Sequence, residues 1–215
     1  MRTETDFFRY ILLLFSLLIL ASCTSPNRTN ILIGTDDCKP PCWIEINPGI
    51  TTKEEMVKLL SDREKSKDGR LKQLESDITW WQSITGHDSY FYSSDNGVIS
   101  KIEIDLRQTE IYLEDVIGIV GTPSKLDIGK ISDGYFFATI FYPESGLAFV
   151  VGGNSFDASS EAKKFPIGSD MLVVKGLFFQ PSEVVSMVNL LYGENAVPQA
   201  LSDIQVWNGY GIYSE

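Results

Sequence analysis

An apolar run of 12 residues near the N-terminus decides which part of this chain belongs to the folded domain. It occupies residues 10–21 and follows two basic residues, Arg2 and Arg9. A membrane-spanning helix needs roughly 20 apolar residues, so this run has the length of a signal-peptide core rather than of a stable span. We therefore expect residues 1–22 to be a signal segment that is removed on export.

The apolar run ends in Leu20-Ala21-Ser22-Cys23, where one aliphatic and two small residues precede a cysteine. This motif resembles the lipobox of bacterial lipoproteins, whose cysteine is lipidated and becomes the first residue of the mature chain. The resemblance implies an exported protein anchored to the bacterial cell membrane through a lipid on Cys23. An ordinary cleaved signal or a short uncleaved anchor remains an alternative, because two acidic residues weaken the positive charge before the run.

The charge of the chain narrows the range of partners. It has 18 basic and 29 acidic residues, a net charge of −11, and residues 1–22 contribute equally to both counts. Such an acidic protein repels the phosphates of nucleic acids, so no nucleic-acid partner is expected. It is repelled by anionic lipids as well, so the acyl chains must hold it on the membrane, which two or three chains do stably.

Two further cysteines, Cys38 and Cys42, flank a Lys-Pro-Pro sequence, and an exported compartment permits a disulfide between them. An extended polyproline segment would separate their Cα atoms by roughly 12 Å. A disulfide needs a separation below about 7 Å. We therefore expect a structural disulfide whose loop bends at Pro40-Pro41 through a turn or a cis proline. A redox or Cu(I)-binding pair, free thiols and bridges between chains are the alternatives.

Three segments, residues 53–60, 113–120 and 181–188, share one helical pattern. Each has an acidic residue at its third position, followed by two apolar pairs that fall on one side of a helix. The acidic residues lie in the first turn, where the helix dipole favours them. Expected helix ends are the capping box of Thr52 and Glu55, Pro181 at a first position, and Gly121 and Gly193 as terminators.

Between these segments, β-branched and aromatic residues predict strands. The expected strands are residues 78–84, 89–93, 98–106, 135–142, 147–151 and 171–179. Ser94-Asp95-Asn96-Gly97 predicts a hairpin turn, because Asn and Gly accept the positive φ of such turns. Residues 61–77 suit a helix or a loop, residues 154–169 a polar surface excursion, and residues 207–213 a last edge strand.

Helices that alternate with hairpins predict an α+β fold with short helices packed on one face of antiparallel sheets. We expect a helix-plus-β-meander unit repeated two to three times. The predicted organisation is a signal peptide (1–22), a lipidated cysteine with a flexible tether (23–35), a first unit (36–107) and a second unit (108–215). One continuous domain over residues 36–215 is the alternative.

The motif at residues 46–52, Ile-Asn-Pro-Gly-Ile-Thr-Thr, is similar to the small lipoproteins of the outer-membrane assembly machinery. Residues 119–123, Ile-Val-Gly-Thr-Pro, resemble the helix end of the same class. The resemblance extends to the β-lactamase-inhibitor-like proteins, which use this unit in tandem. It implies a non-catalytic interaction domain and transfers no binding residues to this chain.

The sequence offers no catalytic motif. Its only histidine, His87, lies in Gly86-His87-Asp88-Ser89, where adjacent side chains point in different directions, so we expect a surface turn. No Gly-x-Ser-x-Gly elbow, phosphate loop or His-Glu-x-x-His motif occurs. The acidic residues lack the spacing of a calcium loop. A carboxylate pair for glycoside cleavage stays open, because only the fold sets its separation. We expect no enzyme, no metal and no cofactor.

Adjacent tryptophans, Trp80 and Trp81, lie in one expected strand and must therefore face opposite sides of the sheet. One of them should lie at a surface or an interface, since exposed Trp and Tyr anchor protein contacts and stack on sugars. Both are candidate partner-facing residues. We expect a non-catalytic module that binds another envelope protein. A solute- or glycan-binding lipoprotein and an inhibitor of an exported enzyme are the alternatives.

Overall fold

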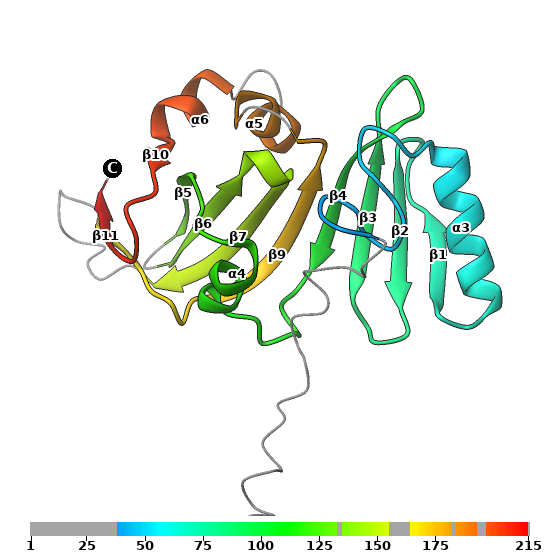
Figure 1. Ribbon diagram of the computed structural model, residues 1–215, viewed down its shortest axis with the longest axis horizontal. Helices are drawn as coiled ribbons and strands as arrows, with labels where there is room; N and C mark the ends of the chain where they lie inside the picture. The colour runs from blue at the N-terminus through cyan, green and yellow to red at the C-terminus, as the bar shows by residue number, and fades with distance from the viewer. Residues whose placement is uncertain (1–37, 133–134, 155–163, 182–183, 193–196, 215) are drawn as a thin grey trace, which may run out of the picture.

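The computed structural model describes residues 38–132, 135–154, 164–181, 184–192 and 197–214. The expected signal segment, Cys23 and the tether lie outside this part of the chain. The α+β class is confirmed: an antiparallel sheet of nine strands dominates, and a few short helices pack against it (Figure 1).

The main sheet has the strand order β1-β2-β3-β4-β9-β7-β6-β5-β10, and β8 and β11 form a separate pair. The strands are β1 (Gly69–Gln73), β2 (Ile78–Ser83), β3 (Asp88–Ser93), β4 (Ile99–Asp105), β5 (Lys125–Ser132), β6 (Tyr135–Tyr142), β7 (Leu147–Asn154), β8 (Lys164–Ile167), β9 (Leu172–Phe179), β10 (Gln205–Val206) and β11 (Gly211–Ser214). The helices are α3 (Lys53–Lys65), α4 (Leu113–Val120), the 3-10 turn η1 (Pro143–Ser145), α5 (Val184–Tyr192) and α6 (Val197–Asp203).

The first helix, α3, begins at the expected capping box. The Glu55 backbone N–H donates to Thr52 Oγ1 at 3.2 Å, and the Thr52 N–H donates to Glu55 Oε2 at 2.9 Å. These bonds satisfy two of the backbone donors that a helix start leaves open. The helix runs on to Lys65, past the expected end, and buries Met56 and Leu60.

The second helix, α4, has the expected bounds, and Gly121 follows it with a φ of 99°. A side chain is disfavoured at such a φ, so glycine suits the position after the last turn. The hairpin turn between β3 and β4 is also confirmed, since the Gly97 N–H donates to the Ser94 carbonyl at 2.8 Å.

The sequence pattern predicts neither β1 nor β5. In β1 no side chain is fully buried, so this edge strand lacks the apolar alternation that reveals strands next to a core. Strand β8 falls in the expected polar excursion, and the last strand, β11, pairs with β8 rather than with the main sheet. Its main-sheet neighbour in sequence is β10, which pairs with β5.

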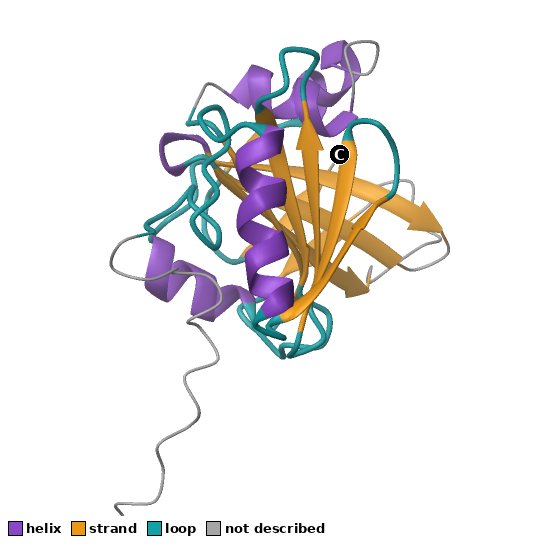
Figure 2. Ribbon diagram, turned by 90° about the vertical axis from the view of Figure 1, so that its right-hand side faces the viewer, coloured by secondary structure: helices purple, strands orange, loops and turns teal. Residues whose placement is uncertain are grey.

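One face of the main sheet, called here the first face, carries the larger apolar core. Trp81, Phe91 and Ile104 from this face belong to one buried cluster with Met56 of α3 and Val116 of α4. Figure 2 shows α3 in the foreground, standing along the strands of its half of the sheet.

The opposite face, called here the second face, is also covered over part of its area. Phe141, Ala148 and Leu177 form a buried cluster with Met187 and Val188 of α5, and residues of α6 pack against its margin. The expectation that helices lie on one face only is therefore wrong. The second face is apolar over β6, β7 and β9, so it must be shielded from water as well.

Candidate functional site

The second face is covered over one half of the sheet and uncovered over the other. Strand pairing aligns one cross-strand row on this face, in the order Lys72, Trp80, Tyr90, Glu103, Leu177, Ala148, Phe141 and Lys125. Leu177, Ala148 and Phe141 are buried beneath α5. We call the surface over β1–β4 the open face; its side chains are Arg70, Lys72, Ile78, Trp80, Gln82, Asp88, Tyr90, Tyr92, Lys101, Glu103 and Asp105.

The two adjacent tryptophans face opposite sides, as the alternation of a strand requires. Trp81 is 3% exposed in the core of the first face, whereas Trp80 is half-buried on the open face. Trp80 is the cross-strand partner of Tyr90, and Ile78 pairs with Tyr92 on the same side. The open face therefore presents three neighbouring aromatic side chains, and the two tyrosines carry no marking motif in the sequence.

Charged side chains lie between these aromatic rings and the covered half. The Lys101 ammonium lies 3.9 Å from the centroid of the Tyr92 ring, and Lys175 of β9 forms an ion pair with Glu103. The Tyr92 hydroxyl donates to Glu103 Oε2 at 3.5 Å. A cation over an aromatic ring is an attractive contact, so these groups hold one another in place.

Burial changes the acidity of groups on the open face. It raises the pKa of Tyr92 to about 12, with the nearby Glu103 carboxylate as the next cause. Burial also raises the pKa of Tyr90 and lowers the pKa of Lys101. Each shift follows from the cost of a charge away from water. At neutral pH both phenols are protonated and their hydroxyls are available as hydrogen-bond donors.

Two cations stand apart at the outer edge of the open face. Arg70 and Lys72 project from β1, and within the described residues neither has an ion-pair partner. By contrast, Asp105 is bound by Arg107 and Asp88 accepts from Gln82 at 3.1 Å. The open face is thus a basic spot on a protein whose net charge is −11.

The edge strand β1 is partly closed to further strand pairing. The outward-facing backbone N–H of Leu71 donates to the Glu64 carboxylate of α3 at 3.2 Å. An unpaired sheet edge is otherwise a template for another strand. A partner is therefore better received on the open face than along this edge.

A second concave region lies between α3 and the segment that precedes it, with a volume of about 780 Å³. Several of its polar groups already have partners within the chain. Glu45 accepts from Arg63 at 2.7 Å, Glu55 caps the helix, and Asp62 accepts from Lys65 at 2.8 Å. Few groups are left to recognise a polar solute there.

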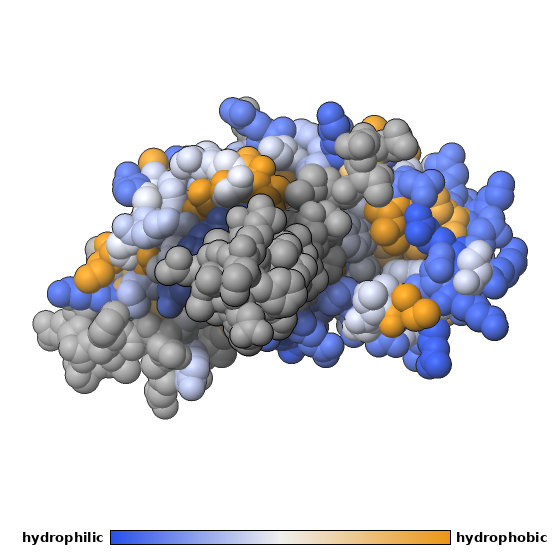
Figure 3. Space-filling view, turned by 60° about the horizontal axis from the view of Figure 1, so that its bottom comes forward, coloured by the Kyte–Doolittle hydropathy of each residue, from blue (hydrophilic) through white to orange (hydrophobic). Residues whose placement is uncertain are grey.

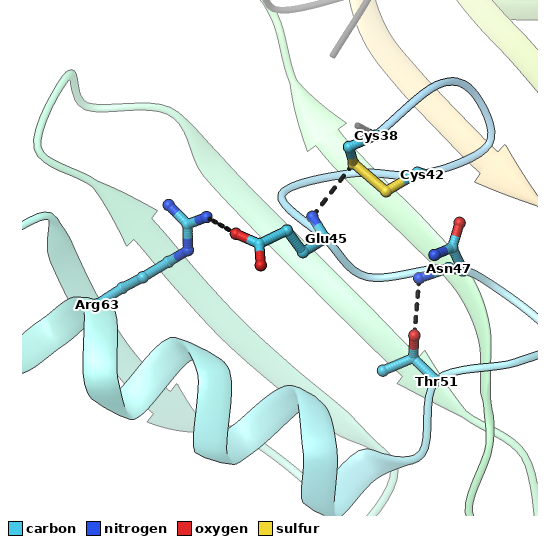
Figure 4. The surroundings of a disulfide bond; sticks show 6 residues. All are labelled: Cys38, Cys42, Glu45, Asn47, Thr51 and Arg63. Carbon is cyan, nitrogen blue, oxygen red and sulfur yellow. Dashed lines mark hydrogen bonds and ion pairs between the residues drawn. A yellow bond between two sulfur atoms is a disulfide. The ribbon is translucent and has the colours of Figure 1, made fainter. Parts of the chain in front are cut away.

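The disulfide loop borders this groove (Figure 4). The Cys38 and Cys42 sulfur atoms are 2.01 Å apart and their Cα atoms 5.1 Å apart, and the Pro40-Pro41 peptide is cis. The expected disulfide and its bend are thus both present. Both cysteines are buried, and the Glu45 N–H donates to Cys38 Sγ at 3.2 Å. Following them, Trp43 packs on Phe178 with ring centroids 5.6 Å apart.

Catalytic and metal chemistry finds no assembled site in the part of the chain that the structure describes. There, no group of three or more His, Cys, Asp or Glu side chains is placed to hold a metal ion. His87 lies in the turn between β2 and β3, where its N–H donates to Ser83 Oγ at 3.1 Å, as expected for a surface turn. No helix among these residues is long and apolar enough to cross a bilayer.

The surface chemistry agrees with this. Figure 3 shows hydrophilic residues over most of the visible surface of the half that carries α3, with hydrophobic residues in small separate patches. Comparison with models of known protein families, with curated proteins and with solved structures finds no match in any of the three.

Proposed function

We propose that this chain is an exported lipoprotein, anchored to the cell membrane through Cys23, whose open face binds another envelope protein without catalysis. The observation that carries the proposal is the cross-strand row on the second face. Within one row, Leu177, Ala148 and Phe141 are covered by a helix, whereas Trp80 and Tyr90 are not. Exposed Trp and Tyr beside Arg are the residue types most enriched at interface hot spots.

We infer in addition that the sheet consists of two copies of one helix-plus-four-strand unit, α3 with β1–β4 and α4 with β5, β6, β7 and β9. The first support is a matching pair of isolated bridges. The N-cap residue of α3, Thr52, bridges Val98 before β4, and the N-cap residue of α4, Tyr112, bridges Leu172 at the start of β9.

The backbone hydrogen bonds beside these bridges also match. In each unit the first helical N–H and the strand N–H after the bridge donate across it, with lengths of 2.8–2.9 Å. The donor and acceptor pairs are Lys53 to Gly97 and Ile99 to Thr51, then Leu113 to Met171 and Val173 to Ile111.

The strand register supports the same duplication independently. The bridges relate β4 to β9 by an offset of 74 residues (172 − 98), which makes Leu177 the counterpart of Glu103. Glu103 and Leu177 are in fact paired with each other, as a local two-fold axis between β4 and β9 requires. Moving outward, Tyr90 becomes the counterpart of Ala148, an offset of 58 residues.

A sheet irregularity follows this second offset. The register shifts after Tyr92 where β3 pairs with β4, and after Val150 where β7 pairs with β9. Their separation is again 58 residues (150 − 92). Bulges are features kept within a family rather than random defects, so their matching positions favour two copies of one unit. The third helical segment, α5, is followed by α6 and β10 and not by another four-strand meander.

The test of the proposed function is crosslinking in living cells followed by purification of the lipidated protein and mass spectrometry. A Trp80→Ala variant should lose a reproducible protein partner that the parent protein captures. Tyr135→Ala is the matched control, because this aromatic residue is 63% exposed at the far half of the sheet. It should retain the partner.

Failure to capture any protein above background would overturn the proposed function. Quenching of tryptophan fluorescence by sugars in the parent protein, lost in Trp80→Ala, would then favour the glycan-binding alternative. A captured exported enzyme whose activity falls on binding would identify the chain as an inhibitor.

A further inference from the structure

The kind of partner follows from what covers the corresponding surface in the other half of the sheet. Through the local two-fold axis, Trp80 corresponds to Phe141 and Tyr90 to Ala148. Because the axis stands perpendicular to the sheet, corresponding residues lie on the same face. Phe141 and Ala148 lie beneath α5, so the open face is the counterpart of a helix-covered surface.

The residues that differ between the two surfaces define the chemistry of the partner. Leu177 is replaced in the first unit by Glu103, and Phe179 by Asp105, so the inner part of the open face is polar. Aromatic surface remains further out, at Trp80 and Tyr90. An apolar strip bordered by charges on both sides matches one face of an amphipathic helix.

The charges on the open face indicate the sign of the partner. Glu103 and Asp105 already bind Lys175 and Arg107. Arg70 and Lys72, beside Trp80, are the cations that lack such a partner within the described residues. An acidic side chain on the partner would supply one, and surface complementarity of this kind fixes orientation and speeds association.

We propose that the open face receives an amphipathic helix of a partner protein, with apolar side chains on Trp80 and Tyr90 and acidic side chains against Arg70 and Lys72. The proposal rests on the proposed function, because it requires a protein partner. The alternative geometry, an added strand at β1, is opposed by the Glu64 carboxylate on the Leu71 N–H and by α3 beside that edge.

The test uses a photoreactive phenylalanine analogue placed at residue 80, 90 or 92 of the full lipidated protein in cells. Mass spectrometry then identifies the partner residue that each position marks. For a helix lying on the strands, the marked residues should be roughly three or four positions apart in the partner sequence, with acidic residues nearby. The double variant Arg70→Glu/Lys72→Glu should lower the yield of each crosslink by at least about tenfold.

Lys58→Glu/Lys67→Glu is the matched control, because it changes the net charge equally on exposed residues outside the open face. It should change the yield by less than about twofold. Partner residues marked at alternate positions would indicate a strand and overturn the proposal, as would marks on a second copy of this chain. A helical pattern unaffected by the charge reversal would overturn the acidic part. No protein crosslink at any position would refute the proposed function itself.

Discussion

At the scale of single residues, the chemistry of this protein depends on which side of a strand a side chain occupies. Trp80 and Trp81 are adjacent and chemically identical, yet one lies on the open face and the other in the core. The alternation of a strand predicts this difference from sequence alone. It does not predict which tryptophan is exposed, because that depends on the face to which α3 and its core residues attach.

The two tryptophans should differ in their effect on stability. Trp81→Ala removes a ring that is 3% exposed and packs within the main core, so we expect it to lower the free energy of unfolding by about 3–5 kcal/mol. Trp80→Ala removes a half-buried ring and should cost about 1–2 kcal/mol. Urea denaturation measures both values. Equal losses would contradict the assignment of the two rings to opposite faces.

The raised pKa of Tyr92 gives the protein a specific sensitivity to alkali. The folded state holds the phenolic proton up to about pH 12, whereas an unfolded chain releases it near the ordinary value of about 10. The stabilising contribution is therefore complete below pH 10 and is lost as the pH rises toward 12. Tyr92→Phe should flatten the fall in stability across this window.

Urea midpoints collected between pH 9 and pH 11.5 would test this. The parent protein should lose more stability than Tyr92→Phe over that range, and the two should differ least in their pH dependence below pH 9. Parallel curves throughout would mean that the Tyr92 hydroxyl is not shielded from water. Tyr90→Phe is the comparison that separates the contributions of the two neighbouring tyrosines, since the pKa of Tyr90 is raised too.

At the scale of secondary-structure elements, local signals predict what local chemistry controls. The capping box at Thr52 and the glycine at residue 121 identify two helices from a few residues each. Strand β1 escapes such reading because its residues are largely exposed and become a strand only by pairing with β2. The open face escapes it too, because Arg70, Trp80 and Tyr90 meet only through the register of three strands.

The edge of β1 gives the prediction that belongs to this scale. Replacing Glu64 by Ala frees the outward Leu71 N–H, which should allow β1 to pair with another chain. We expect a concentration-dependent rise in sedimentation coefficient in ultracentrifugation. Glu54→Ala, an exposed substitution on the same helix, is the control and should remain at the parent value. An unchanged Glu64→Ala variant would show that α3 alone protects the edge.

At the scale of the whole molecule, the attachment of the chain and the open face lie on opposite sides of the sheet. The described part begins at Cys38, whose disulfide loop leads to Trp43 and its contact with Phe178 on the first face. The open face is the reverse side of the same strands. An anchor upstream of Cys38 therefore leaves the aromatic surface accessible to a partner rather than pressing it against the segment that leads to the membrane.

This arrangement makes lipidation of Cys23 the decisive prediction for the molecule as a whole. Radioactive palmitate should label the parent protein, and Cys23→Ser should abolish the label and release the protein from the membrane fraction. Stable anchoring takes two or more acyl chains, so a chain without the lipid should not stay bound. Cys38→Ser/Cys42→Ser is the control and should keep the label. Label persisting in Cys23→Ser would refute the lipobox, whereas unlabelled protein retained in the membrane fraction would indicate an uncleaved apolar anchor at residues 10–21.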